Sequence, residues 1–173
     1  MCERMAPASP FWTFSLQIYG RPGVPAACVR LQDQCGVDVN ILLFCLFLAR
    51  NGRALMQEDV QVMDSQMRDW RLNGVIKLRE ARRFLKEPPE AFKGLDVHAF
   101  RERVKAIELE AERLQQEGLF ALRPLNDWGK ACPYSSQLAL DNMSAYAKCL
   151  GVNFPAPDVE PLVGALDNND QQT

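Results

Sequence analysis

The sequence contains few of the residues that most often build a metal or catalytic centre. It has one histidine, His98, and its six cysteines include no Cys-x-x-Cys pair. Zinc sites need closely spaced cysteine and histidine ligands, so we expect no metal and no cofactor. Glycine-rich phosphate loops, dinucleotide fingerprints and Glu-x-x-His pairs are also absent from the sequence. We assign no catalytic residue, and we favour a role without catalysis while leaving an enzyme open.

Net charge and long apolar runs are scarce as well. The formal net charge is −2 over 173 residues, so no overall field attracts nucleic acid or an anionic membrane. The longest apolar run, residues 41–49, is well short of the roughly twenty residues of a membrane helix. The N-terminal residues lack the apolar segment of a signal peptide. We therefore expect a cytoplasmic location and no membrane partner.

The apolar run indicates a helix that is buried on all sides. Asp38 precedes this run as a capping residue, and Arg50, Asn51 and Gly52 follow it as typical signals of a helix C-terminus. A helix that is apolar all round has to be surrounded by other helices. The sequence therefore predicts an all-α fold, a single-domain bundle of about six helices around a fully apolar central helix.

Apolar spacing and capping residues predict the other helices and the domain limits. The remaining helices are expected over residues 10–19, 24–35, 58–86, 96–118 and 135–150. Residues 1–9 are expected to be a flexible N-terminus, 10–153 the helical domain, and 154–173 a mostly disordered tail rich in proline and polar residues.

Two of these helices carry a specific expectation. Gly74 lies in the apolar stripe of the helix over 58–86, so either a neighbouring helix approaches closely there or the helix breaks at 72–74. In the helix over 96–118, Leu109 lies opposite the apolar stripe and should be exposed. That predicted buried stripe consists of Val97, Phe100, Val104, Ile107, Ala111 and Leu114.

A group of polar residues lies at the junction before the central helix. We call it the polar corner: Gln32, Asp33, Asp38 and Asn40. These side chains are suited to hold a cation or a ligand hydroxyl. The alternative, which we favour, is that Asp38 caps the central helix and the others satisfy exposed helix ends.

Arginines gather along one side of the helix over 58–86. We call this set the basic stripe: Arg68, Arg71, Arg79, Arg82, Arg83 and Lys86. Such a stripe suits phosphates, but it lacks interleaved aromatics, and we judge nucleic acid an unlikely partner. Glu108 and Glu112 flank the apolar stripe of the next helix, so we predict structural ion pairs between them and Arg79 or Arg83.

Several short elements together resemble a known family. They are Trp12 and Tyr19, Leu31-Gln32-Asp33, Asp38-Val39-Asn40 before Leu42-Leu43-Phe44, Trp70, Leu78-Arg79 with Arg82-Arg83, and Glu108-Leu109 with Glu112. In this combination, over about residues 10–120, the chain resembles a proteobacterial family of conserved hypothetical proteins with a helical domain of unknown function. The resemblance implies a small, cytoplasmic, helical protein and brings no activity, cofactor or partner.

Three functions are compatible with these features. The leading hypothesis is a cytoplasmic interaction or adaptor protein that binds another protein, because the usual motifs of catalysis are missing. The alternative is a helical bundle, possibly an enzyme, that binds a small apolar or isoprenoid-like ligand, with the polar corner at the mouth of the pocket. The third is nucleic-acid binding through the basic stripe. The sequence leaves the oligomeric state open.

Overall fold

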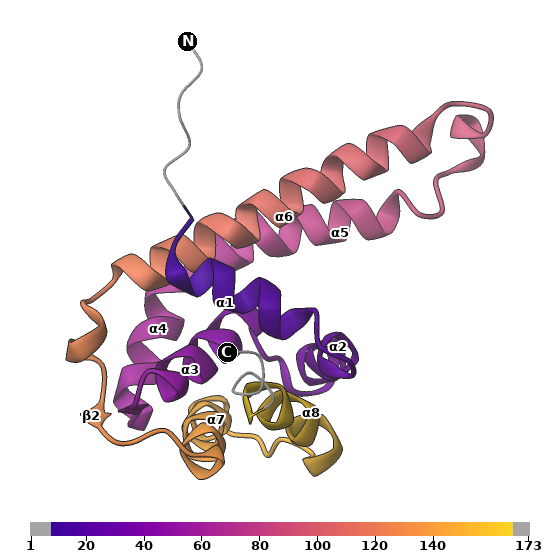
Figure 1. Ribbon diagram of the computed structural model, residues 1–173. Helices are drawn as coiled ribbons and strands as arrows, with labels where there is room; N and C mark the ends of the chain where they lie inside the picture. Colours follow the sequence, from indigo (N-terminus) through magenta and orange to yellow (C-terminus); the bar gives the residue numbers. More distant parts are fainter. Residues whose placement is uncertain (1–7, 168–173) are drawn as a thin grey trace.

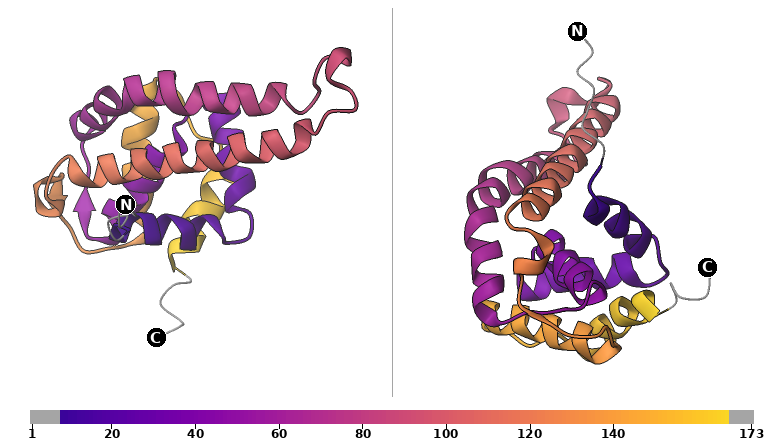
Figure 2. Two further views of the ribbon diagram at one scale, coloured as in Figure 1. Left: turned by 90° about the horizontal axis from the view of Figure 1, so that it is seen from above. Right: turned by 60° about the vertical axis from the view of Figure 1, so that its left-hand side comes forward.

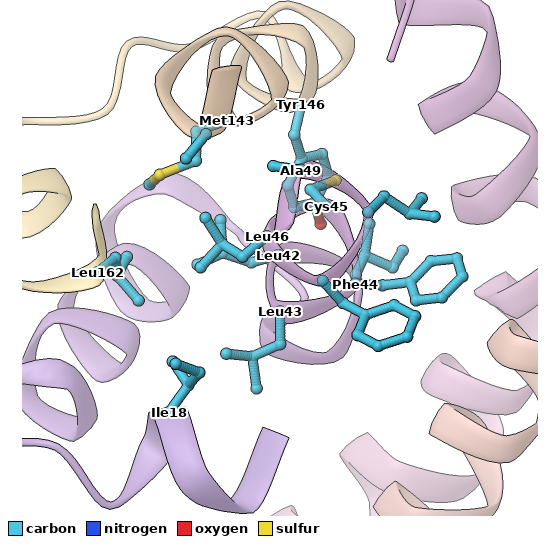
Figure 3. Packing of buried hydrophobic residues seen from close by; sticks show 14 of the residues in the cluster. Ile18, Leu42, Leu43, Phe44, Cys45, Leu46, Ala49, Met143, Tyr146 and Leu162 are labelled. Carbon is cyan, nitrogen blue, oxygen red and sulfur yellow. The ribbon is translucent and has the colours of Figure 1, made fainter. Parts of the chain in front are cut away.

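The computed structural model describes residues 8–167, which fold around the apolar helix α3 (Val39–Arg50). Every residue of α3 from Asn40 to Ala49 is buried. Helices α1, α4, α6 and α7 pack against it, whereas α5 projects away (Figure 1). Figure 3 shows Leu42 and Leu46 on the side of Leu162, whereas Leu43 points toward Ile18. The predicted all-α bundle around a fully apolar central helix is confirmed.

The elements follow one another with short connections. In chain order they are α1 (Pro10–Tyr19), α2 (Val24–Cys35), α3, β1 (Arg53–Ala54), α4 (Gln57–Trp70), a π-helical turn (Arg71–Val75), α5 (Ile76–Phe84), α6 (Val97–Ala121), β2 (Lys130–Ala131), α7 (Ser136–Leu150) and α8 (Ala156–Asp167). Short 3-10 turns cover Glu90–Phe92 and Leu125–Asp127. The two strands pair antiparallel, with Arg53 opposite Ala131.

Capping residues set the ends of several helices as the sequence predicts. The Ser9 hydroxyl accepts from the Trp12 N–H at the start of α1, and the Asp38 carboxylate accepts from the Asn40 N–H at the start of α3. Gly36 ends α2 in the left-handed region, with φ of 68°, where glycine has no steric penalty. The corner between α2 and α3 is therefore tight.

The C-terminal segment differs from its prediction. Residues 156–167, expected in a disordered tail, form helix α8, which packs against α2 and α7. Proline is compatible with the first turn of a helix, so Pro157 does not prevent this start. Leu162, Val163 and Leu166 are buried, and the burial of this apolar face offsets the hydrogen bond lost at Pro161. The prolines of this segment therefore led to a wrong prediction of disorder. Residues 1–7 and 168–173, at the ends of the predicted flexible segments, lie outside the described residues.

The helix predicted over 58–86 is continuous but irregular. No neighbouring helix approaches Gly74 closely, because a Cβ on Gly74 would meet only the Trp70 ring at 3.8 Å, so that alternative was wrong. The regular α-helix is interrupted at Arg71–Val75, which includes residues 72–74, by a π turn in which the Ile76 N–H bonds the Arg71 carbonyl. The predicted interruption is therefore present, but as a wider helical turn and not as an end of the helix.

Helices α5 and α6 form an arm that projects beyond the rest of the molecule (Figure 2). The predicted buried stripe of α6 is only half correct. Val104 and Ala111 are buried, but Phe100, Ile107 and Leu114 are 48%, 56% and 44% exposed. In the arm α6 has α5 as its main neighbour, and one helix does not cover the whole apolar stripe. Among residues 8–167 no helix is both long and apolar enough to cross a bilayer.

Candidate functional site

A groove lies where the arm meets the body of the protein. Its cavity is about 470 Å3 in volume. Residues from α1, the corner between α2 and α3, the π turn, α5 and α6 line it. Ligand pockets commonly measure roughly 300–1,000 Å3, so a small molecule fits this space.

The floor of the groove is the N-terminus of α3, held by hydrogen bonds from α6 and α7. The Asp38 N–H donates to the Tyr146 hydroxyl at 2.8 Å, and the Gln115 amide donates to the Asp38 carboxylate at 2.6 Å. The Asn40 amide donates to Gln115 at 3.3 Å and accepts from Gln116 at 2.8 Å. This network fixes the floor against α6. Burial, with the nearby Asp38 charge, raises the pKa of Tyr146 well above its ordinary value, so this hydroxyl keeps its proton.

Two polar atoms among the groove residues have no hydrogen-bond partner in the described part of the chain. They are the Oε1 atom of Gln116 and the hydroxyl of Ser15, and both are buried. A buried polar atom without a partner costs about 1–3 kcal/mol, and most such atoms in folded proteins are satisfied. The groove therefore has unused hydrogen-bonding capacity at its polar side.

Arg79 joins the arm to the corner between α2 and α3. Its guanidinium donates to Gln32 at 2.6 Å, to Glu108 at 3.1 Å and to Glu112 at 2.7 Å. Arg82 also donates to Glu108. The predicted ion-pair carboxylates Glu108 and Glu112 thus both bind Arg79. The Arg79 side chain extends from α5 and contacts both α2 and α6. These contacts set the position of the arm over the groove.

The two carboxylates beside Arg79 shift in opposite directions. Burial raises the pKa of Glu108, but the hydrogen bonds and charges of Arg82 and Arg79 outweigh it, so the pKa is lowered. Burial raises the pKa of Glu112 more than the single partner Arg79 lowers it. Glu108 is therefore held as an anion, while Glu112, which lines the groove, protonates more readily.

The polar corner and the basic stripe contact each other. Arg71 donates to Asp64 at 2.8 Å and to Asp38 at 3.3 Å, and Arg83 lies 3.7 Å from Asp33. With Arg79 on Gln32, three arginines of the stripe meet three residues of the corner. The fourth corner residue, Asn40, bonds α6 instead. The stripe residues Arg68 and Lys86 are exposed and lie at its two ends.

The π turn lies against the groove. Arg71, Leu72 and Val75 of this turn and Ile76 directly after it all line the groove. These positions share one side of the helix, and from this side Arg71 donates to Asp38 at 3.3 Å. Such turns occur frequently at functional sites.

The rim of the groove is apolar. Large side chains around it are partly exposed: Leu16, Tyr19, Val29, Leu72 and Leu109. Leu109, which the sequence predicts to be exposed, is 53% accessible and belongs to this rim. The groove thus has polar groups at its base and apolar groups at its mouth, a distribution that suits an amphipathic molecule.

The sequence reasoning missed Ser15, Gln115 and Gln116. A signal for the two glutamines was present, because Gln115 and Gln116 follow Glu112 by three and four residues, on the side of α6 that also carries Glu108. Nothing in the sequence marked Ser15 apart from other serines. The groove lining contains no cysteine or histidine, and no group of three metal-binding side chains occurs among residues 8–167.

The fold and the groove define the chain as an all-α protein, and a comparison with known families assigns it to one of them. Residues 10–119 match the family described as "Protein of unknown function (DUF2390)", so the chain belongs to this family. The matched segment contains every residue that lines the groove, whereas α7 and α8 lie outside it. No curated protein and no solved structure matches the chain.

Proposed function

We propose that this protein binds a small, neutral, amphipathic molecule in the groove. The observation that carries the proposal is a cavity with an apolar rim whose lining includes Gln116, a residue whose buried Oε1 atom has no hydrogen-bond partner among residues 8–167. A ligand hydroxyl or amide would supply the missing donor, and its apolar part would lie against Leu16 and Leu109. This is the ligand-binding alternative of the sequence analysis, with the ligand polar at one end.

The charges of the lining support a neutral ligand. Arg71 and Arg79 face Asp38 and Glu112 in the groove, and each arginine is already paired within the chain. The formal charges of these four residues cancel, so no unbalanced charge attracts an ion. A charged headgroup would lose hydration without gaining a partner.

Native mass spectrometry of gently purified protein, followed by a ligand panel, tests the proposal. The panel compares octanol and octanamide with octanoate and octylamine, which share the apolar part and differ in headgroup charge. We expect the neutral compounds to raise the melting temperature and the charged ones to leave it unchanged, because only a molecule that binds the native state stabilises it. No shift with any compound, together with a bare protein mass, would reject a groove ligand.

A matched pair of variants locates the binding. Gln116→Leu removes the acceptor, so the shift produced by octanamide should fall, whereas Gln137→Leu changes an exposed glutamine on α7 and should retain it. Each shift is compared with the same variant without ligand. Equal shifts in both variants would place the compound elsewhere.

A second candidate function, the adaptor role, is supported by the tip of the arm. An apolar pocket of about 270 Å3 lies there, and Phe84, Phe92 and Leu95 beside it are at least half exposed. Exposed apolar side chains that cluster in this way often mark protein contacts. Selection of peptides on the immobilised protein should enrich an apolar motif that the Phe92→Asp variant no longer binds. Equal recovery on both proteins would contradict the role.

Nucleic-acid binding has less support than either. Arg71, Arg79 and Arg82 are about one-fifth to one-quarter exposed, and each contacts a carboxylate. Binding of phosphates would require these pairs to break.

We retain the proposal of a cytoplasmic location. It is supported by the free cysteines Cys28 and Cys45, because disulfides are rare in the cytosol. Burial raises the pKa of both thiols and keeps them unreactive.

A further inference from the structure

The outer face of the arm, on the side of α6 away from the groove, carries large apolar side chains that no residue between 8 and 167 covers fully. Phe100, Ile107 and Leu114 follow one another at intervals of seven residues and are each about half exposed. The Trp70 indole, 45% exposed, donates to the Ala111 carbonyl at 3.0 Å, which places it beside α6 between Ile107 and Leu114. We call these four residues the outer arm face.

A spacing of seven keeps side chains on one line along a helix, as in helices that pair along their length. Phe100 and Leu114 lie equally far from Ile107 on either side. An antiparallel copy of α6 centred on Ile107 would therefore bring Phe100 of one chain to Leu114 of the other. Ile107 would meet its own copy at the twofold axis.

The flanking charges fit the same arrangement. Arg103 and Glu110 lie along the same edge of the apolar line, four residues before and three residues after Ile107. In an antiparallel pair with a twofold axis, equivalent edges face each other, so Arg103 of each chain would approach Glu110 of the other. Within its own chain Glu110 accepts hydrogen bonds from Arg113, and the Arg103 guanidinium lies over the Phe100 ring, so the contact between chains would add to these contacts. Asp96 and Glu117, which would approach at the two ends, already accept hydrogen bonds from Ala99 and Ser9 of their own chain.

We propose that the outer arm face binds a second copy of this chain, with the two α6 helices antiparallel and centred on Ile107. The partner helix must carry the same line of apolar side chains and the same order of charges, and a second copy of α6 has both. The groove lies on the opposite side of α6, where Leu109 and Glu112 point, so the two sites are separate. This inference does not depend on the groove ligand.

Crosslinking tests the register. Ile107→Cys places two thiols at the proposed axis, whereas Leu109→Cys places an equally exposed thiol on the groove side. We expect a short bismaleimide to crosslink the Ile107→Cys chain on the order of tenfold faster or more, because an associated partner holds the second thiol at an effective concentration in the mM range. The wild-type chain, with its own cysteines, gives the background. Equal rates for both variants would overturn the proposal.

Sedimentation velocity over a concentration series tests the association itself. Wild type should shift toward a dimer as concentration rises, and Ile107→Lys should remain monomeric because it sets two lysines against each other at the axis. Arg103→Glu should weaken the dimer, and adding Glu110→Arg should restore it. Circular dichroism checks that these exposed positions leave the fold intact. A wild-type monomer at all concentrations, including one that binds another molecule through this face, would overturn the proposal.

Discussion

The body around α3 and the arm formed by α5 and α6 are stabilised in different ways. In the body, apolar side chains surround α3 on every side, and Phe44 packs its ring against Phe11 at 4.8 Å and Trp128 at 5.7 Å. Helix α5 in the arm has no fully buried residue, and Arg79 and Arg82 hold it to Glu108. The groove lies between this apolar body and an arm that ion pairs join to it.

The largest effect is expected in the body. Phe44→Ala removes a fully buried ring from the centre of the aromatic cluster and should lower the free energy of unfolding by about 3–5 kcal/mol. Phe84→Ala, at an exposed arm position, should change it by less than about 0.5 kcal/mol. Urea unfolding of both variants measures the difference. Similar losses would contradict the contrast between body and arm.

The next largest effect concerns the charges that hold the arm. Glu108→Gln removes the shared carboxylate of Arg79 and Arg82 and should cost about 2 kcal/mol, less than a fully buried pair because both arginines are partly exposed. Hydrogen exchange should quicken in α5 while α3 remains protected. Glu110→Gln, an exposed pair partner of Arg113 on the same helix, is the matched control and should leave exchange unchanged. Uniform loss of protection in both helices would show that body and arm unfold together.

The pH dependence of stability sharpens the comparison further. Because the pKa of Glu108 is lowered in the folded chain, its contribution is present above the unfolded-state pKa of about 4.3 and is lost as pH falls through the folded value. The pKa of Glu112 is raised, so its contribution is present below the unfolded pKa and is lost as pH rises through the folded value.

Unfolding midpoints at a series of pH values measure both effects. Glu112→Gln should remove the loss on the neutral side and unfold at an equal or higher urea concentration than wild type at pH of about 7. Glu108→Gln should flatten the acid side instead. An acid limb unchanged by Glu108→Gln would show that Arg79 and Arg82 do not hold this carboxylate in solution.

The smallest effect separates two glycines. Gly74→Ala in the helix that leads to the arm meets only the Trp70 ring at 3.8 Å and should stabilise the chain by about 0.5–1 kcal/mol. Gly129→Ala near the strands of the body would place its Cβ 2.1 Å from the Ala54 carbonyl oxygen, at φ of +48°, and should destabilise it. Thermal melts compare the two. A loss at Gly74→Ala would mean that the π turn depends on glycine.

The body was predictable from the sequence, whereas the arm was predictable only in part. The all-apolar run and the caps Ser9 and Asp38 specify local structure that later packing does not change. The burial of the α6 stripe depends instead on how many helices surround it, and sequence spacing does not report this. The same reasoning explains α8, where burial against α2 outweighed the prolines.

Only part of the groove lining was predictable from the sequence, and its arrangement was not. The polar corner and the basic stripe were identified separately, and they meet beside the π turn, where Arg71 donates to Asp38. No sequence period predicts such a turn. Ser15 and Gln116 stand out only in the folded chain, where a buried polar atom of each has no hydrogen-bond partner among residues 8–167.

A crystal structure of the gently purified wild-type protein tests the central claim most directly. If the groove binds a neutral amphipathic molecule, continuous non-protein density should extend from the Oε1 atom of Gln116 toward the rim at Leu109. Ordered water alone in the groove, with Gln116 and Ser15 satisfied by the chain itself, would contradict the claim.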